Sequence, residues 1–166
     1  MFPDTMLTQA RSLLAAAEAR AVRLATAESC TGGLIAGCLT EIAGSSAVVD
    51  RGYVVYDNRA KIEMLGVREA TLAAEGAVSE AVAREMAEGA MTRSGCGLAV
   101  AVTGVAGPGG GSDAKPVGLV HIAAALRGGP TLHERHVFPG DRSAIRLATV
   151  GAALRLAQRT LAGEAQ

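Results

Sequence analysis

The chain has 166 residues, the length of one typical domain, and 49% of them are hydrophobic against 19% charged, which is too apolar for a disordered chain. Its sixteen basic and sixteen acidic residues cancel, and aromatic residues make up only 2%, so neither a general attraction to nucleic acid or anionic membranes nor a base-stacking surface is expected. We therefore predict one domain over residues 1–166 that binds neither nucleic acid nor membrane.

The cysteines and the N-terminus indicate a cellular compartment. Cys30, Cys38 and Cys96 are an odd number without CxxC spacing, which argues against a disulfide framework or a zinc site and for a reducing environment. The first ten residues lack the basic and apolar segments of a signal peptide, and no apolar stretch approaches the ~18 residues that cross a bilayer. These features predict a cytoplasmic protein.

The first part of the chain alternates helical and extended patterns. The expected elements are a helix capped by Asp4 or Thr5 and ending near residue 20, a strand at 23–28, a helix from Thr31 to Gly44, a strand at 48–56, a short helix capped by Asp57 or Asn58, and a helix from Ser79 to about residue 93.

The rest of the chain continues this alternation of helical and extended patterns and indicates the fold class. It predicts a buried strand at 97–102, a glycine-rich loop at 104–116, a buried strand at 117–126, a turn at 128–130, an edge strand at 132–138 and a final helix capped by Asp141. That helix carries an apolar stripe of Leu147, Val150, Leu154, Ala157 and Leu161, which we expect to face the core, with a subunit seam as the alternative. Because the turn at 128–130 sends the chain back in a hairpin, the sheet should be mixed. We expect an α/β fold, a three-layer α/β/α sandwich with a mixed central sheet.

The segment Ala-Glu-Ser-Cys-Thr-Gly-Gly at 27–33 lies where a strand should turn into a helix. A helix N-terminus presents unpaired backbone N–H groups, so the backbone of Thr31, Gly32 and Gly33 can stabilise an oxyanion beside a nucleophilic Ser29. Equally, Ser29 or Thr31 can be an ordinary N-cap. Cys30 is a second possible nucleophile, although cysteine more often serves as a small buried hydrophobe.

A base for that serine is suggested by Tyr-Asp-Asn-Arg-Ala-Lys at 56–61. None of the histidines lies in a triad-like motif, whereas a lysine whose pKa is lowered by burial or by a neighbouring cation can remove a proton. Lys61 is one of only two lysines among the sixteen basic residues, and arginine cannot serve because it stays protonated. The alternatives are a solvated helix lysine and, for Tyr56, a core residue at a strand end.

A third signal is the glycine-rich loop that directly follows the apolar run at 97–102. Thr103, Gly104, Gly107, Gly109 and Gly110 lie where α/β proteins bind ligands, beyond the carboxyl ends of strands, and glycine-rich backbone can cradle a phosphate there. The loop can also be a flexible connection. Arg142 and Arg146, four residues apart at the start of the last helix, share one face and can clamp a phosphate or be solvated.

Together these segments resemble the CinA C-terminal domain family of nicotinamide-nucleotide amidohydrolases. The resemblance rests on AESCTGG at 27–33, YDNRAK at 56–61, GAVSEAVAREMAEGA at 76–90 and TGVAGPGGGSDAKPVGLV at 103–120, and it covers the chain from about residue 7 to 161. Four ordered motifs are far more specific than any one of them. The chain has no room for the N-terminal domain of longer CinA proteins, so it resembles the stand-alone form.

The resemblance implies hydrolysis of the carboxamide of nicotinamide mononucleotide, without a metal or organic cofactor, by a three-layer domain that often assembles as a homo-oligomer. It places the family's serine on Ser29, its tyrosine on Tyr56, its lysine on Lys61 and its glycine-loop threonine on Thr103. Two other functions stay open at this point. One is a non-catalytic pyridine-nucleotide sensor, and the other is an amidase for another nucleotide carboxamide.

Overall fold

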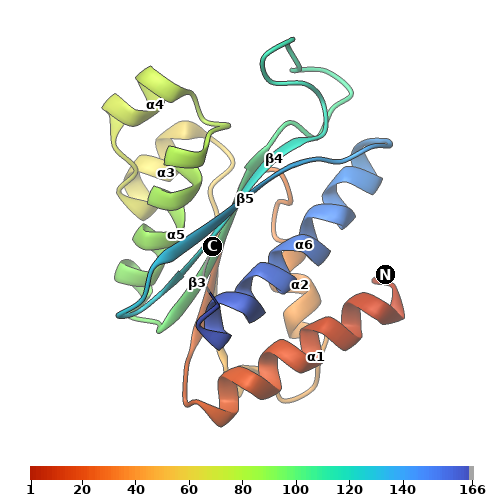
Figure 1. Ribbon diagram of the computed structural model, residues 1–166, viewed down its shortest axis with the longest axis vertical. Coiled ribbons are helices and arrows are strands. Elements are labelled where there is room, and N and C mark those ends of the chain that lie inside the picture. Colours follow the sequence, from red (N-terminus) through yellow and green to blue (C-terminus); the bar gives the residue numbers. More distant parts are fainter. Residues whose placement is uncertain (165–166) are drawn as a thin grey trace.

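A computed structural model describes residues 1–164 and shows one five-stranded sheet between two layers of helices (Figure 1). The strands are β1 (Leu24–Glu28), β2 (Val49–Val54), β3 (Leu98–Gly104), β4 (Leu119–Leu126) and β5 (Thr131–Val137), in the sheet order β2-β1-β3-β4-β5. β1 runs parallel to β2 and β3, whereas β3–β4 and β4–β5 are antiparallel. The predicted three-layer α/β/α sandwich with a mixed sheet is confirmed.

The helices divide between the two faces of the sheet. They are α1 (Asp4–Ala19), α2 (Leu34–Thr40), α3 (Asn58–Leu65), α4 (Glu69–Glu75), α5 (Glu80–Ser94) and α6 (Arg142–Ala162), with a short 3₁₀ helix η1 (Ser45–Ala47) between α2 and β2. α1, α2 and α6 cover one face, and α3, α4 and α5 lie on the other (Figure 1). None of the described helices is long and apolar enough to span a bilayer.

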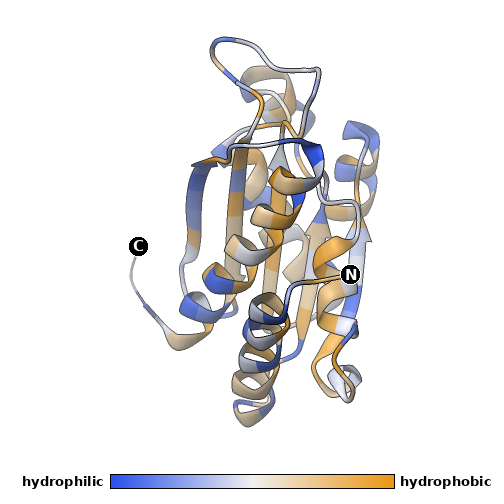
Figure 2. Ribbon diagram, turned by 90° about the vertical axis from the view of Figure 1, so that its right-hand side faces the viewer, coloured by the Kyte–Doolittle hydropathy of each residue, from blue (hydrophilic) through white to orange (hydrophobic). Residues whose placement is uncertain are grey.

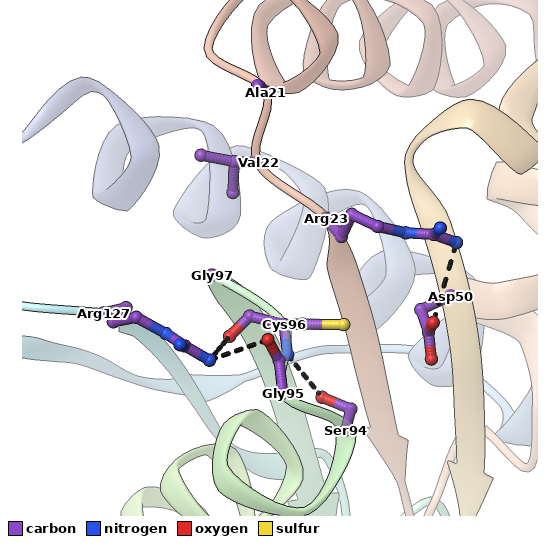
Figure 3. Close-up of a pocket in the computed structure, with 9 residues that line it drawn as sticks. All are labelled: Ala21, Val22, Arg23, Asp50, Ser94, Gly95, Cys96, Gly97 and Arg127. Atoms are coloured by element: carbon purple, nitrogen blue, oxygen red, sulfur yellow. Dashed lines mark hydrogen bonds and ion pairs between the residues drawn. The ribbon is translucent and has the colours of Figure 1, made fainter.

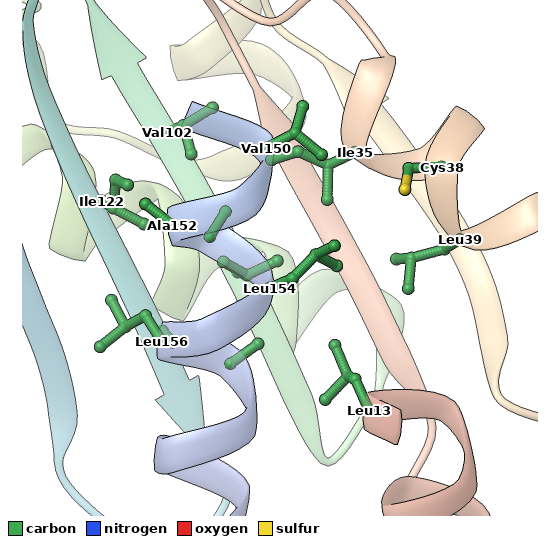
Figure 4. Packing of buried hydrophobic residues seen from close by; sticks show 14 of the residues in the cluster. Leu13, Ile35, Cys38, Leu39, Val102, Ile122, Val150, Ala152, Leu154 and Leu156 are labelled. Carbon is green, nitrogen blue, oxygen red and sulfur yellow. The ribbon is translucent and has the colours of Figure 1, made fainter. Parts of the chain in front are cut away.

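The larger core lies under α6, which crosses β3 and β4. Val150 and Leu154 are buried in it as the sequence predicts (Figure 4). Ala157 and Leu161 are buried there too, and Leu147 is partly buried against the same cluster. Hydropathy follows the layers: the inner strands are hydrophobic, whereas most residues of the edge strand β5 are hydrophilic (Figure 2). The predicted stripe on the last helix is thus a core face.

Helix starts were predicted with mixed success. Asp57, Ser79 and Asp141 each accept a backbone N–H at the start of α3, α5 and α6, as expected. The prediction for α1 was wrong, because Pro3 is its N-cap and Asp4 already lies in the first turn. Two other differences concern short helices: α2 spans only residues 34–40 of the expected 31–44, and the seven-residue α4 was not predicted.

A glycine in α5 sets how closely this helix approaches the end of α3. A Cβ on Gly89 would lie 2.0 Å from the carbonyl oxygen of Leu65, so we expect Gly89→Ala to lower the free energy of unfolding by about 1–3 kcal/mol, as overpacking does. Gly151 in α6 is the matched control, because its added Cβ would meet no atom closer than 3.4 Å. Gly151→Ala should raise stability by up to about 1 kcal/mol, since alanine is the better helix former. Urea unfolding of both variants measures the contrast, and equal stabilities would refute the close approach.

Candidate active site

The residues singled out in the sequence gather at the carboxyl ends of the three parallel strands. Ser29 directly follows β1, and its N–H donates to the carbonyl of Val102 in β3 at 3.1 Å. On the other side of β1, the N–H of Val55 donates to the carbonyl of Glu28 at 2.9 Å. These two bonds join the segments after β1, β2 and β3 into one edge, which is where α/β sheets bind ligands.

The turn from Ser29 to Gly33 leads into α2, and its hydrogen bonds differ from those expected. The N-cap of α2 is Gly33, in the left-handed region with φ 97°, so the interpretation of Ser29 or Thr31 as an ordinary N-cap is wrong. The N–H of Gly32 donates to the carbonyl of Ser29 at 3.1 Å, and that of Gly33 to the carboxylate of Glu28 at 3.1 Å. The expectation that Gly32 and Gly33 offer free N–H groups to a substrate is therefore corrected.

Arg146 holds the opposite side of the same turn. Its Nε donates to the carbonyl of Cys30 at 3.1 Å and its Nη2 to the carbonyl of Thr31 at 2.8 Å. The sequence left open whether Arg146 binds a substrate phosphate with Arg142 or is solvated, and in this structure two of its donors fix the backbone beside Ser29. The Arg146 guanidinium therefore stabilises the turn.

Lys61 points from α3 into the protein and is only 1% exposed, which overturns the alternative of a solvated helix lysine. Its Nζ donates to the carbonyls of Val55 at 3.0 Å and Tyr56 at 3.3 Å, both just beyond the end of β2. Burial lowers the pKa of this amine below its usual value, although the negative charge of Asp57 opposes the shift. A buried lysine with a lowered pKa has the properties of a proton acceptor.

Tyr56 and Arg142 connect the segment after β2 with the start of α6 across the site. Tyr56 is 61% exposed, so the alternative of a core tyrosine is wrong. Nη2 of Arg142, in the first turn of α6, donates to the Tyr56 hydroxyl at 3.0 Å, and Nη1 donates to the carbonyl of Gly107 at 2.8 Å. Arg142 therefore places the tyrosine and the glycine-rich loop next to each other.

The glycine-rich loop leaves the sheet between β3 and β4 and projects beyond its edge (Figure 1). Gly104 and Gly107 are required by close packing, because an added Cβ would lie 2.7 Å from the carbonyl of Leu119 and 2.6 Å from Val117, respectively. Gly109 and Gly110, by contrast, are exposed and meet no atom closer than 4.0 Å. At Gly109 and Gly110 the loop therefore presents open backbone.

Two residues have a structural position that the sequence did not predict. Thr103 is buried and its hydroxyl donates to the carbonyl of Ala77 at 2.8 Å, which ties the end of β3 to the segment before α5. Glu28, at the end of β1, is fully buried and binds the start of α2. The available signal for Glu28 was a lone carboxylate in an otherwise uncharged strand that leads directly into a helix.

A cavity of about 300 Å³ lies at the opposite, amino-terminal edge of β1 and β3 (Figure 3). Its polar groups bind one another: Arg127 donates to the carbonyls of Gly95 and Cys96, and Arg23 pairs with Asp50 at 3.6 Å. None of the catalytic or substrate-binding residues predicted from the sequence lines this cavity. Within residues 1–164, no cluster of three or more His, Cys, Asp or Glu side chains is arranged to hold a metal ion.

The fold and the site together define a class of protein: an α/β sandwich that carries a serine-containing turn and a buried lysine at the carboxyl edge of its sheet. Comparison with known proteins specifies it: the family model of the CinA C-terminal domain matches residues 6–161, so the chain belongs to the CinA C-terminal domain family, as the four motifs predicted. The chain is 51% identical over 140 residues to nicotinamide-nucleotide amidohydrolase PncC of Escherichia coli, covering 84% of this chain and 85% of that protein.

Other relatives are longer proteins or solved structures. A CinA-like protein of Akkermansia muciniphila is 54% identical over 142 residues, which are 86% of this chain but 33% of that protein, so the chain spans about a third of such relatives. Among solved structures, competence/damage inducible protein CihA of Agrobacterium tumefaciens superposes with a TM-score of 0.94 at 53% identity and covers 98% of both chains.

Proposed function

We propose that this protein hydrolyses the carboxamide of nicotinamide mononucleotide, giving nicotinate mononucleotide and ammonia. The name of the E. coli relative, at 51% identity over most of both chains, supports the reaction. The observation that carries the proposal in this chain is the buried amine of Lys61, held on two carbonyls at the sheet edge where Ser29 emerges. An amide hydrolase of this kind needs a nucleophile and a base at one place.

In the proposed mechanism Ser29 is the nucleophile and neutral Lys61 is the base. A neutral amine has two N–H groups and one lone pair, and the two carbonyls of Val55 and Tyr56 accept two N–H groups. The lone pair is then left to take the proton of the Ser29 hydroxyl as its oxygen attacks the amide carbon. Burial supports this role, because it lowers the pKa of Lys61 and so increases the neutral fraction.

The later steps return every proton. The Lys61 ammonium gives its proton to the departing nitrogen, ammonia leaves, and the acyl group stays on Ser29 as an ester. Water then attacks the ester while Lys61 accepts one of its protons. Lys61 passes that proton to the Ser29 oxygen as the ester bond breaks, which regenerates the serine and neutral Lys61 and releases nicotinate mononucleotide. The Tyr56 hydroxyl accepts a hydrogen bond from Arg142, so its own proton is free to be donated toward the reacting groups.

Arg142 and the outer glycine-rich loop are the proposed phosphate site. Both arginines donate two hydrogen bonds to the protein, but Arg142 is exposed whereas Arg146 is only partly exposed. Arg142 is therefore the arginine better placed to bind an anion, together with the open backbone of Gly109 and Gly110. Charge-assisted contacts to the phosphate, which is remote from the bond that breaks, would position the amide.

We also propose that the enzyme works in the cytoplasm and as a homo-oligomer. Cys30, Cys38 and Cys96 are free thiols and all three are buried, as suits a reducing compartment. The assembly follows from the family resemblance, and light scattering of the purified protein measures it.

The test measures release of ammonia and nicotinate mononucleotide from nicotinamide mononucleotide with a metal chelator present. We expect turnover, and we expect kcat/KM for unphosphorylated nicotinamide riboside to be at least ~10-fold lower, since a charged hydrogen bond contributes about 1.5–3 kcal/mol. Equal kcat/KM for the two substrates would contradict the phosphate site. Tight binding of the intact mononucleotide without ammonia release would support a sensor instead, and turnover of only another nucleotide carboxamide would change the substrate.

A further inference from the structure

Glu28 is a fully buried carboxylate at the junction of β1 and α2. Among the described residues no basic side chain forms an ion pair with it. Burying an unpaired carboxylate is costly unless hydrogen bonds replace its hydration. A carboxylate kept there, where an apolar side chain would fill the space at lower cost, calls for a reason beyond packing.

Five hydrogen-bond donors replace the water that the Glu28 carboxylate loses on burial. Four of them belong to the turn from Ser29 to Gly33 and to α2. Oε2 accepts from the Thr31 hydroxyl at 2.7 Å, from the Gly33 N–H at 3.1 Å and from the Ile35 N–H at 2.9 Å. Oε1 accepts from the Ala36 N–H at 2.8 Å and from the Thr26 hydroxyl at 3.1 Å. The carboxylate thus ties the segment after Ser29 to the strand that precedes it.

These bonds also decide which backbone groups face a substrate. The helix donors of Gly33, Ile35 and Ala36 are directed at Glu28, so the positive end of α2 acts on this carboxylate. On the other side Arg146 binds the carbonyls of Cys30 and Thr31. In a planar trans peptide the N–H points opposite to the carbonyl, so the Thr31 N–H is turned away from Arg146.

We propose that Glu28 is a positioning residue for the nucleophile: it fixes the turn from Ser29 to Gly33 so that the Ser29 hydroxyl meets Lys61 and the Thr31 N–H serves as an oxyanion donor. The inference rests on the proposed amide hydrolysis by Ser29. Arg146 holds the carbonyl side of the turn, and Glu28 holds its hydroxyl and N–H side. A turn held from both sides has its dipoles set before substrate binds, which is the condition for electrostatic stabilisation of an oxyanion.

Glu28→Gln tests the proposal with little change in shape. Whichever way the amide lies, its NH₂ faces a backbone N–H, that of Ala36 at one position or those of Gly33 and Ile35 at the other. Either the turn or the start of α2, which follows it directly, must then shift. We expect kcat to fall at least ~100-fold, as displacement by about 1 Å does, while KM changes less than ~3-fold. Thr31→Val, which removes only one donor from Glu28, should give a smaller loss of kcat.

A second measurement separates positioning from stability and from the identity of the substrate. The rate at which a sulfonyl fluoride labels Ser29, followed by mass spectrometry, should fall in Glu28→Gln by a factor similar to that for kcat. The control is Thr160→Val in α6, which also removes a buried hydroxyl bond, to the carbonyl of Leu156 at 2.8 Å, and should leave labelling and kcat unchanged. Folding of each variant is checked by thermal unfolding.

The outcomes distinguish the two proposals. Slower labelling of folded Glu28→Gln supports the positioning role even if wild-type protein does not hydrolyse nicotinamide mononucleotide, in which case only the proposed substrate fails. Labelling of the folded variant at the wild-type rate overturns the positioning role, whatever the turnover. A loss of kcat in Thr160→Val equal to that in Glu28→Gln would also overturn it, because the effect would then be one of general stability.

Discussion

Replacing Ser29 with alanine is expected to lower kcat for nicotinamide mononucleotide by at least ~10⁴-fold, the scale seen when a serine nucleophile is removed from a hydrolase. The variant keeps the turn, because Glu28 and Arg146 hold it through Thr31, Gly33 and backbone carbonyls and not through the serine hydroxyl. KM should therefore change little. The measurement is ammonia release at saturating substrate, with thermal unfolding to show that the variant folds like the wild type.

Cys30 is the competing nucleophile, one residue away, and provides the matched control. Burial raises the pKa of its thiol to about 12, and the neighbouring Arg146 and Lys61 only partly offset this. Almost no thiolate is then present near neutral pH, and the thiolate is the reactive form. Cys30→Ala should retain activity within a few-fold of wild type. If Cys30→Ala abolishes turnover while Ser29→Ala does not, the nucleophile has been assigned to the wrong residue.

The parts of the fold that the sequence predicted are those with strong periodic or apolar patterns. The apolar runs of β3 and β4, the second of which is interrupted by the buried His121, have both faces covered, and the stripe on α6 is buried along one face, so burial and pattern agree. The short helices were less predictable. α4 has seven residues with one buried position, Thr71, so no apolar stripe marks it, and α2 loses its expected first turn because residues 31–33 form the tight turn held by Glu28.

The candidate site was predictable in its members and less so in their contacts. The structure brings Ser29, Tyr56, Lys61 and Arg142 to one edge of the sheet because the strands that precede them are parallel and end together. Glu28 determines which N–H groups remain available to a substrate, because it accepts hydrogen bonds from four residues that lie three to eight positions downstream. Spacing alone does not tell whether a helix N-terminus faces a substrate or a carboxylate of its own chain.

Lys61→Arg is the second substitution for which we expect a large effect. Arginine keeps the positive charge but cannot give up its proton, so it removes general base catalysis, and kcat should fall at least ~100-fold. The other lysine, Lys115, is the control: its Nζ donates to the carbonyl of Glu75 at 2.5 Å, and Lys115→Arg should leave kcat within a few-fold of wild type.

The pH dependence adds a readout that a merely structural cation would not give. Burial lowers the pKa of Lys61, and only its neutral form accepts a proton, so kcat/KM should rise with pH and level off above that pKa. The midpoint of this rise should lie below the usual lysine value of about 10.4. In Lys61→Arg the rise should disappear together with the rate, because no group with that pKa is left. A variant that keeps the wild-type rise and most of its kcat would show that another group is the base and that Lys61 only joins the ends of β2 and α3 through Val55 and Tyr56.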